Sequence, residues 1–189
     1  WWTGGGAGAR RLVPRGHGGA RGIAGLVEKL PEPRRSEVRG RFEDALRRVE
    51  AAGLLPSLME RTGRVAAEAV DLAMDYFRLG IACPFLEDES CSIYHDRPIA
   101  CREYLVTSPP ACCDALTAET LEPVPLPTRV WAAVAREENG IPNTDPATCV
   151  PLVMVPPWAA LNPDPGTLRP GPEIHQKVFA RFSRDRRGE

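Results

Sequence analysis

The sequence predicts a mainly α-helical protein of one domain, with a helical hairpin and C-terminal helices around an irregular region rich in cysteine and proline. Three observations lead to this prediction. Two stretches before residue 80 carry apolar residues at helical spacing, most of the twenty prolines lie between Pro98 and Pro172, and five of the six cysteines lie between Cys83 and Cys113. A chain of 189 residues fits a single hydrophobic core.

The N-terminal segment is predicted to be irregular. Residues 1–22 are rich in glycine and arginine, contain no acidic residue and show no apolar periodicity. Such a composition buries too little apolar surface to favour a packed element on its own. We therefore expect the single cysteine-cluster domain to span residues 23–189.

The first long helix is predicted over residues 34–54. Its apolar residues recur at intervals of three and four, which places them on one helix face. Gly53 provides a stop signal. The predicted face consists of Val38, Phe42, Ala45, Leu46 and Val49.

A second helix face follows and ends at Gly80. A short link through Pro56 joins it to the first helix, so two helices of about twenty residues are expected to form a hairpin. The second face consists of Val65, Ala69, Leu72, Ala73, Tyr76 and Phe77.

The rest of the chain is predicted to be mostly loop and turn, because proline lacks a backbone donor and breaks helix interiors. Short helices are expected over residues 128–138 and 173–184, and a short strand over residues 151–155. Loop-rich stretches of this length rarely keep their shape through apolar burial alone. Some other interaction is expected to hold this region.

The charge and the N-terminus set expectations for partners and compartment. A net charge of -1 argues against general nucleic-acid binding, which favours basic chains. No run of about 18 apolar residues predicts a membrane span, and no export signal is visible in the sequence. These features predict a cytoplasmic protein that binds neither membrane nor nucleic acid, and they identify no partner.

The clustered cysteines indicate metal or redox chemistry. In a reducing compartment, clustered thiols are used for metal or redox sites more often than for disulfides. Thiolates bind zinc and iron–sulfur clusters strongly, and ligation fixes loops that lack a core. The candidates are Cys83, Cys91, Cys101, Cys112 and Cys113, whereas Cys149 stands apart without an assigned role.

Other interpretations of the cysteines stay open at this point. They are consistent with buried apolar thiols, or with three disulfides if the protein is exported. Their spacing lacks the short C-x2-C element of zinc fingers. Side chains of adjacent residues diverge, so one of Cys112 and Cys113 is expected to be a bystander. His95 precedes a turn-forming Asp-Arg-Pro element and is expected to be solvated.

The cysteine region resembles a known family. The elements C-P-F-L, C-x-I-Y, R-P and C-R-x-Y occur in order between Cys83 and Tyr104, and the similarity continues through LPEPRRSEVRGRF before them and LEPVPLPTRVWAAVAR after them. This pattern is similar to that of the YkgJ-like cysteine-cluster proteins, described as a zinc- or iron-chelating domain, some of which are named flagellin N-methylase or Fe–S oxidoreductase. The resemblance implies that Cys83, Cys91 and Cys101 are metal ligands, and it favours Cys113 over Cys112 as a further ligand.

The N-terminus departs from the family pattern. The family begins with C-x2-C-x2-C-C before an Arg and a Leu-Val-Pro element; here Arg11-Leu12-Val13-Pro14 is present, but glycine, alanine and tryptophan occupy the cysteine positions. The leading hypothesis is therefore a protein that binds zinc, iron or an iron–sulfur cluster in a structural or redox role. The alternatives are an Fe–S oxidoreductase or lysine N-methylase-like enzyme, and a degenerate member without metal. The sequence identifies no catalytic residue and does not decide whether the protein is an enzyme.

Overall fold

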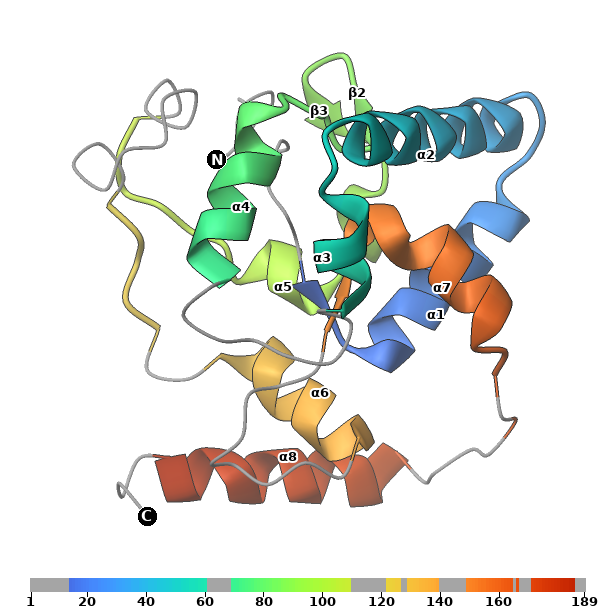
Figure 1. Cartoon of the computed structure of the whole chain (residues 1–189). Helices are drawn as coiled ribbons and strands as arrows, with labels where there is room; N and C mark the ends of the chain where they lie inside the picture. The colour runs from blue at the N-terminus through green and yellow to red at the C-terminus, as the bar shows by residue number, and fades with distance from the viewer. Residues whose placement is uncertain are drawn as a thin grey trace.

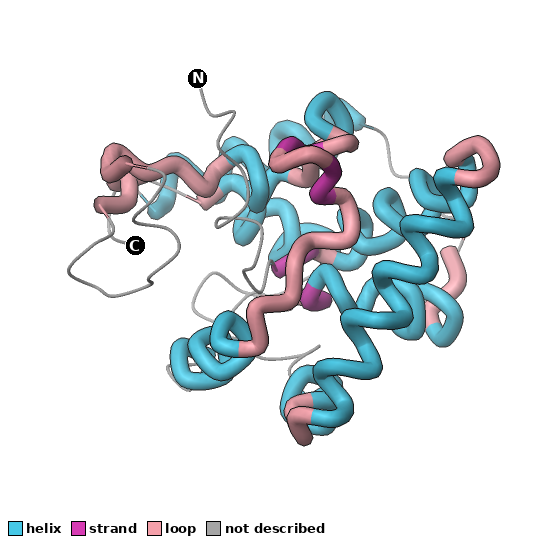
Figure 2. The backbone as a smooth tube through the Cα atoms, turned by 90° about the horizontal axis from the view of Figure 1, so that it is seen from above, coloured by secondary structure: helices cyan, strands magenta, loops and turns pink. Residues whose placement is uncertain are grey.

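The structure, a computed structural model, describes residues 14–60, 69–109, 122–126, 129–139, 149–164, 166 and 171–185. The predicted mainly helical class is confirmed: helices dominate the described chain (Figures 1 and 2). The α-helices are α1 (His17–Lys29), α2 (Arg34–Ala51), α3 (Leu55–Glu60), α4 (Ala69–Arg78), α5 (Ile99–Arg102), α6 (Val130–Asn139), α7 (Val155–Leu161) and α8 (Gly171–Asp185).

The strands of the described chain are short and antiparallel. β1 (Pro14–Arg15) pairs with β4 (Val150–Pro151), which joins the start of the described chain to a segment far along the sequence. β2 (Leu86–Glu87) pairs with β3 (Ser90–Cys91) in a local hairpin. Two 3-10 turns, η3 (Tyr94–Asp96) and η5 (Leu152–Met154), complete the described elements.

The core lies where α1, α2 and α7 meet. α1 packs against α7, α2 and α6, while α2 also contacts α3 and η5 (Figure 1). Apolar side chains from α1, α2, α3, α4, η5 and α7 contribute to the shared interior, and their removal from water supplies the main stabilisation. Its largest fully buried members are Phe42, Phe85, Leu58, Val38, Val49, Val150 and Val155.

The helix predicted over residues 34–54 is confirmed as α2. Val38, Phe42, Ala45 and Val49 are buried, as the spacing predicts, and Leu46 is partly buried against the same core. The helix ends before Gly53, which adopts a φ of 72°. Only glycine takes this left-handed conformation without strain, so Gly53 allows the chain to turn back.

The link after α2 is itself helical. Pro56 lies in the first turn of α3, where its missing N–H costs no helical hydrogen bond. The second predicted helix is described as α4, in which Leu72 and Tyr76 are buried; Val65 lies outside the described residues. Gly80, with a φ of 61°, follows α4 and marks the predicted end of that helix.

The prediction of an irregular N-terminal segment over residues 1–22 is wrong for the part that is described. β1 forms at Pro14, and α1 begins at His17 and crosses the predicted domain boundary at residue 23. The reason is tertiary: Glu138 of α6 accepts a 3.1 Å hydrogen bond from the Gly18 amide, and Ala20 is fully buried. Residues 1–13 lie outside the described part of the chain.

Two glycines leave room for Glu138 where α1 meets α6. A Cβ atom on Gly16 would lie 2.7 Å from the Glu138 carboxylate and 3.2 Å from Ala135 Cβ. A Cβ atom on Gly18 would approach the same carboxylate even more closely. These glycines have a low helix propensity. Because they lack a side chain, however, the Glu138 carboxylate can approach the start of α1 and cap it.

The strand predicted over residues 151–155 is largely wrong. Only Val150–Pro151 forms a strand, and the chain then turns through η5 into α7. Pro156 and Pro157 occupy the first turn of α7, where proline is favoured because its φ suits a helix and its absent N–H is not needed. The apolar run is buried on every side, which removes the periodicity that separates strand from helix.

The two C-terminal helices are confirmed. α6 matches the helix predicted over residues 128–138, and α8 matches the one over residues 173–184; the two pack against each other.

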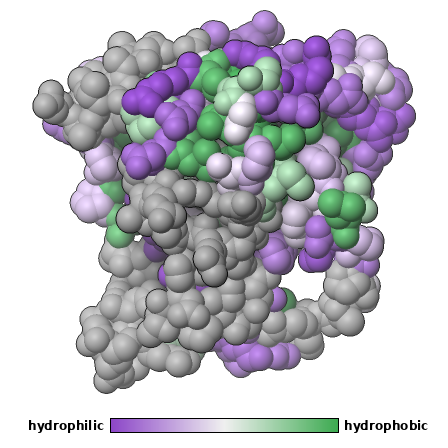
Figure 3. Space-filling model, viewed as in Figure 1, coloured by the Kyte–Doolittle hydropathy of each residue, from purple (hydrophilic) through white to green (hydrophobic). Residues whose placement is uncertain are grey.

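Hydrophilic residues cover the outside near α2, and a hydrophobic area is visible between α2 and α4 (Figure 3). None of the helices in the described chain is long and apolar enough to cross a membrane.

Candidate functional site

The cysteine segment, residues 83–103, carries three of the predicted metal ligands on three short elements. Cys83 lies in the turn before β2, Cys91 on β3 and Cys101 on α5. All three are partly buried. Cys83 and Cys91 pack against the main core, whereas Cys101 belongs to α5, which packs against α6.

Two arginines of α2 hold the first half of this segment. Arg34 donates a 2.9 Å hydrogen bond from Nη2 to the carbonyl of Ser92. Arg41, seven residues later and therefore two turns along the same face, donates from Nη1 to the carbonyl of Pro84 at 3.2 Å and to Glu87 Oε1 at 3.0 Å. The hairpin that carries Cys91 is thus fixed to α2 by charged hydrogen bonds.

Glu87 completes this anchor. Burial raises the pKa of its carboxyl, but the hydrogen bond from Arg41 and the charge of Arg34 outweigh burial and leave the pKa lowered. Glu87 is therefore an anion over the neutral pH range and holds both arginines in place. Their guanidinium groups are partly exposed, so each ion pair contributes modestly.

The buried side chain of Phe85 supports the same hairpin. Phe85 is 1% exposed and meets Phe42 of α2 edge to face, with ring centroids 5.6 Å apart. Its carbonyl accepts hydrogen bonds from both the amide and the hydroxyl of Ser92, at 2.9 and 3.0 Å. Aromatic pairs of this geometry add stability beyond the area they bury. The turns beside Cys83 and Cys91 are thereby tied together.

Arginines also organise the second half of the segment. Arg102 donates from Nε to the carbonyl of Arg97 at 2.7 Å and from Nη2 to the carbonyl of His95. Arg97 lies over the Tyr94 ring, 3.8 Å from its centroid, and donates to the Tyr94 carbonyl. Residues of the I-Y, R-P and C-R elements of the sequence thus form the contacts that shape the loop around Cys101.

Glu103 connects the segment to α6. Its carboxylate accepts hydrogen bonds from the amides of Val130 and Trp131, at 2.5 and 3.4 Å. These amides lie in the first turn of α6, where backbone donors lack helical partners and an anion complements the helix dipole. Position 103 therefore acts as a distant N-cap and fixes α5 relative to α6.

The thiols differ in their surroundings. Cys149 is 9% exposed, and burial raises its pKa to about 11, so the thiol is protonated near neutral pH. Cys83 lies near the buried Tyr76 hydroxyl; burial and then the neighbouring thiol raise the pKa of that hydroxyl. Cys149 is thus poorly suited to act as a ligand or nucleophile, because both roles require the thiolate.

The described residues do not by themselves form a metal site. No three histidine, cysteine, aspartate or glutamate side chains within them are grouped so that they could hold a metal ion. Cys83, Cys91 and Cys101 are therefore not assembled as a set of three ligands. The remaining candidates, Cys112 and Cys113, lie outside the described residues.

His95 occupies an exposed position, as predicted for a turn residue. Its ring meets the Tyr94 ring edge to face at 5.5 Å, on the short turn η3.

Sequence reasoning missed the arginines of α2, because Arg34 and Arg41 look like ordinary charges on the polar side of an amphipathic helix. Their spacing of seven residues was the available signal.

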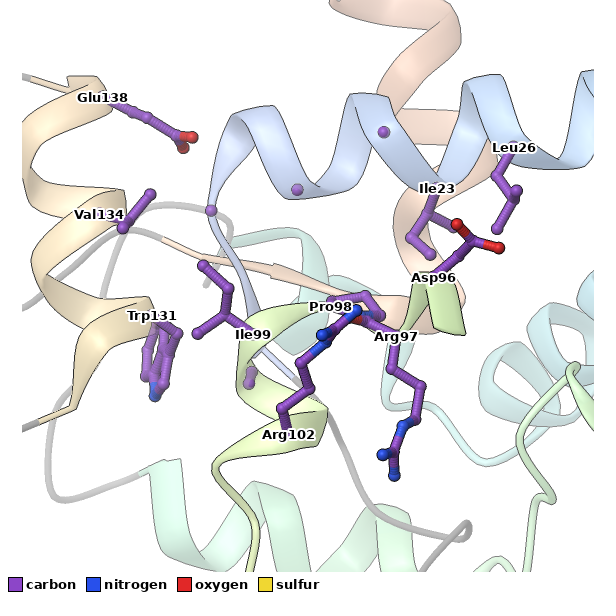
Figure 4. A pocket seen from close by; sticks show the side chains of 14 residues that line it. Ile23, Leu26, Asp96, Arg97, Pro98, Ile99, Arg102, Trp131, Val134 and Glu138 are labelled. Carbon is purple, nitrogen blue, oxygen red and sulfur yellow. The ribbon is translucent and has the colours of Figure 1, made fainter. Parts of the chain in front are cut away.

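A groove beside the cysteine segment was also missed by sequence reasoning. It lies between α1, the η3–α5 stretch and α6 and encloses about 460 Å³. Ile99 of α5 reaches toward the space between α1 and α6, with Trp131 and Val134 of α6 across from it (Figure 4). The residues on either side of Cys101, Ala100 and Arg102, line this groove.

The chain was compared with known families, curated proteins and solved structures. No family model matches it, and neither a curated protein nor a solved structure shows significant similarity to it.

Proposed function

We propose that the chain is a metal-binding protein in which thiolates of the cysteine segment hold zinc or iron, with iron either as a single ion or as part of an iron–sulfur cluster. The proposed ligands are Cys83, Cys91, Cys101 and Cys113, with Cys112 as the alternative fourth ligand. The similarity of the C-P-F-L to C-R-x-Y pattern to the YkgJ-like family suggests this role.

The main structural support is the way in which the three described cysteines are carried. Each lies on a short element fixed through arginine-to-carbonyl bonds, and each is only partly buried. This arrangement places thiols where an ion can reach them. Soft thiolate ligands favour zinc and iron–sulfur clusters over hard oxygen-binding ions.

The proposal requires rearrangement on binding. Because the described residues hold no group of three ligands, the thiols must approach one another when the ion binds, and the fourth must come from Cys112 or Cys113. Part of the free energy of metal binding offsets the entropy that the loops lose on ordering. Metal binding of this kind therefore stabilises the folded chain. We therefore propose a structural role for the metal and assign no reaction to it.

The test is metal content and affinity of the reduced chain. Protein purified without metal is titrated with zinc in competition with a chromogenic chelator and, separately, reconstituted anaerobically with iron and sulfide. Tight binding of one zinc per chain supports a zinc site, whereas a brown product supports an iron–sulfur cluster. A folded chain that retains neither metal contradicts the proposal and favours a degenerate member of the family.

Single alanine variants identify the ligands. Cys101→Ala is expected to lower zinc affinity by more than the roughly 10–100-fold that loss of an outer-shell partner costs. Cys149→Ala is the matched control, because Cys149 is buried and its pKa of about 11 keeps it protonated. Equal affinity of the two variants would exclude Cys101 from the site. Comparing Cys112→Ala with Cys113→Ala then assigns the fourth ligand.

A further inference from the structure

We propose that the groove between α1, α5 and α6 binds a small-molecule anion that carries an apolar body. The proposal goes beyond metal binding and uses none of the proposed cysteine ligands. It rests on the volume of the groove, its apolar walls and the arginines that line it (Figure 4).

The groove has the size and lining of a ligand site. Its volume of about 460 Å³ falls within the range of roughly 300–1,000 Å³ that is typical of small-molecule pockets. The apolar walls come from three separate elements, with Ile23 on α1, Ile99 on α5 and Trp131 on α6. Ile99 is 39% exposed, a large apolar side chain that a ligand would cover.

Part of the α1 wall of the groove is bare backbone. Gly19 and Gly22 of α1 line it, and a Cβ atom at either position would meet no atom within 4 Å. A flat ligand can therefore lie directly against the helix at this point. The same open space leaves room for a larger side chain at position 22 to extend into the groove.

The charges in the groove favour an anion. Arg97 and Arg102 line it, and neither forms an ion pair with a carboxylate in the described part of the chain. Among the described residues, both donate to backbone carbonyls and neither positive charge is paired with a carboxylate. Such guanidinium groups suit carboxylate, phosphate or sulfonate oxygens.

Of the two acids that line the groove, Asp96 lies on the same side as the arginines, and Glu138 lies away from them (Figure 4). Glu138 points from α6 toward the start of α1, where the Gly18 amide donates to it (Figure 4). Asp96 is exposed and lies near Leu26, at the other end of the α1 wall (Figure 4). In the proposed complex the apolar body lies between α1 and α6, and its anionic group lies beside Arg102, away from Glu138.

The experiment uses two fluorescent probes that share one aromatic body. Anilinonaphthalene sulfonate (ANS) carries the anionic group, and phenylnaphthylamine (NPN) lacks it. Titration of the metal-free full chain should show one ANS site that is tighter than the NPN site by about tenfold, equivalent to one well-placed charged contact. Raising NaCl from about 0.1 to about 1 M shortens the Debye length from roughly 10 to roughly 3 Å and should remove this difference.

Two glycine variants of α1 locate the probe. Gly22→Leu fills the groove and should weaken ANS binding at least about tenfold. Gly25→Leu is the matched control: it lies on the same helix, also has open space around its Cβ, and does not line the groove. Its affinity should stay within about twofold of the parent, as for a surface change far from the site.

Either of two results overturns the proposal. Equal ANS affinity of the two leucine variants would place the probe elsewhere on the protein. NPN binding as tight as ANS at low salt would show that the arginines do not recognise an anion. The salt titration needs only the unmodified chain, so it decides even if Gly22→Leu does not fold. Because metal-free protein is used, the outcome is independent of the zinc measurements.

Discussion

The helical core and the cysteine segment are held together by different interactions. Around α1, α2 and α7, apolar side chains such as Val38 and Val49 are fully buried. In the segment from Cys83 to Glu103, arginines reach backbone carbonyls, and most side chains are partly exposed. The first region draws its stability from many small apolar contributions, whereas the second combines a few buried side chains such as Phe85 with charged hydrogen bonds.

This difference separates stability from shape. Apolar burial is non-directional and scales with area, so it favours a compact helical core without specifying loop geometry. Hydrogen bonds from a guanidinium group are directional and fix the positions of the oxygens that accept them. The core therefore sets most of the free energy of unfolding, and the arginines set the positions of the turns that carry the thiols.

The largest predicted effect is in the core. Phe42 is 1% exposed and contacts Phe85, so Phe42→Ala removes a buried ring and leaves a cavity between α2 and the hairpin. The expected loss is about 3–5 kcal/mol of unfolding free energy. Urea denaturation followed by circular dichroism measures it.

Phe179 on α8 provides the control for this substitution. Its side chain is 54% exposed, so Phe179→Ala removes the same atoms from a site with far less buried area. We expect a loss below about 1 kcal/mol. Comparable losses for the two variants would show that burial does not distinguish the core from α8.

The sequence predicted the parts of this fold that depend on local periodicity. Helix α2 was predictable because Val38, Phe42, Ala45 and Val49 repeat at helical spacing. The start of α1 was not, since its glycine-rich first turns are stabilised by Glu138, more than a hundred residues away. The strand expected at residues 151–155 failed because a run that is buried on every side has no period.

The candidate site was predictable in composition but not in geometry. The cysteine spacing and its resemblance to a family singled out Cys83, Cys91 and Cys101, and whether they bind metal stays a prediction. The anchors Arg34 and Arg41 and the groove beside Ile99 arise from contacts between distant segments. The seven-residue spacing of the two arginines places them on one helix face, but it does not show which distant segment they contact.

A medium effect is predicted for the arginine anchors. Arg41→Leu keeps helix propensity but removes the bonds to the Pro84 carbonyl and to Glu87. The expected loss is about 1–2 kcal/mol, reduced from that of a buried charged bond because the side chain is partly exposed. Hydrogen exchange should show faster exchange of the Ser92 amide, which donates to Phe85, than in the parent.

Arg47→Leu is the matched control on the same helix. Arg47 is 75% exposed on its side chain and pairs only with Asp44, within the described chain and one turn away. Its removal should change the unfolding free energy by less than about 0.5 kcal/mol and leave the Ser92 amide protected. Equal loss of Ser92 protection in both variants would refute the assignment of Arg41 as an anchor.

The smallest predicted effect is a pH dependence at the start of α1. The rings of His17 and Trp158 meet at a tilt of 36°, with centroids 5.0 Å apart, and burial followed by the charge of Arg21 lowers the pKa of His17 below 6.5. The unfolded chain therefore binds this proton more readily, so the contribution of His17 to stability is complete above pH 6.5 and decreases as the pH falls below that value. Urea unfolding on either side of pH 6.5 should show a smaller loss on acidification for His17→Gln than for the parent. An identical loss in both proteins would mean that His17 titrates alike in the folded and unfolded chains, and that its packing on Trp158 does not disfavour the imidazolium.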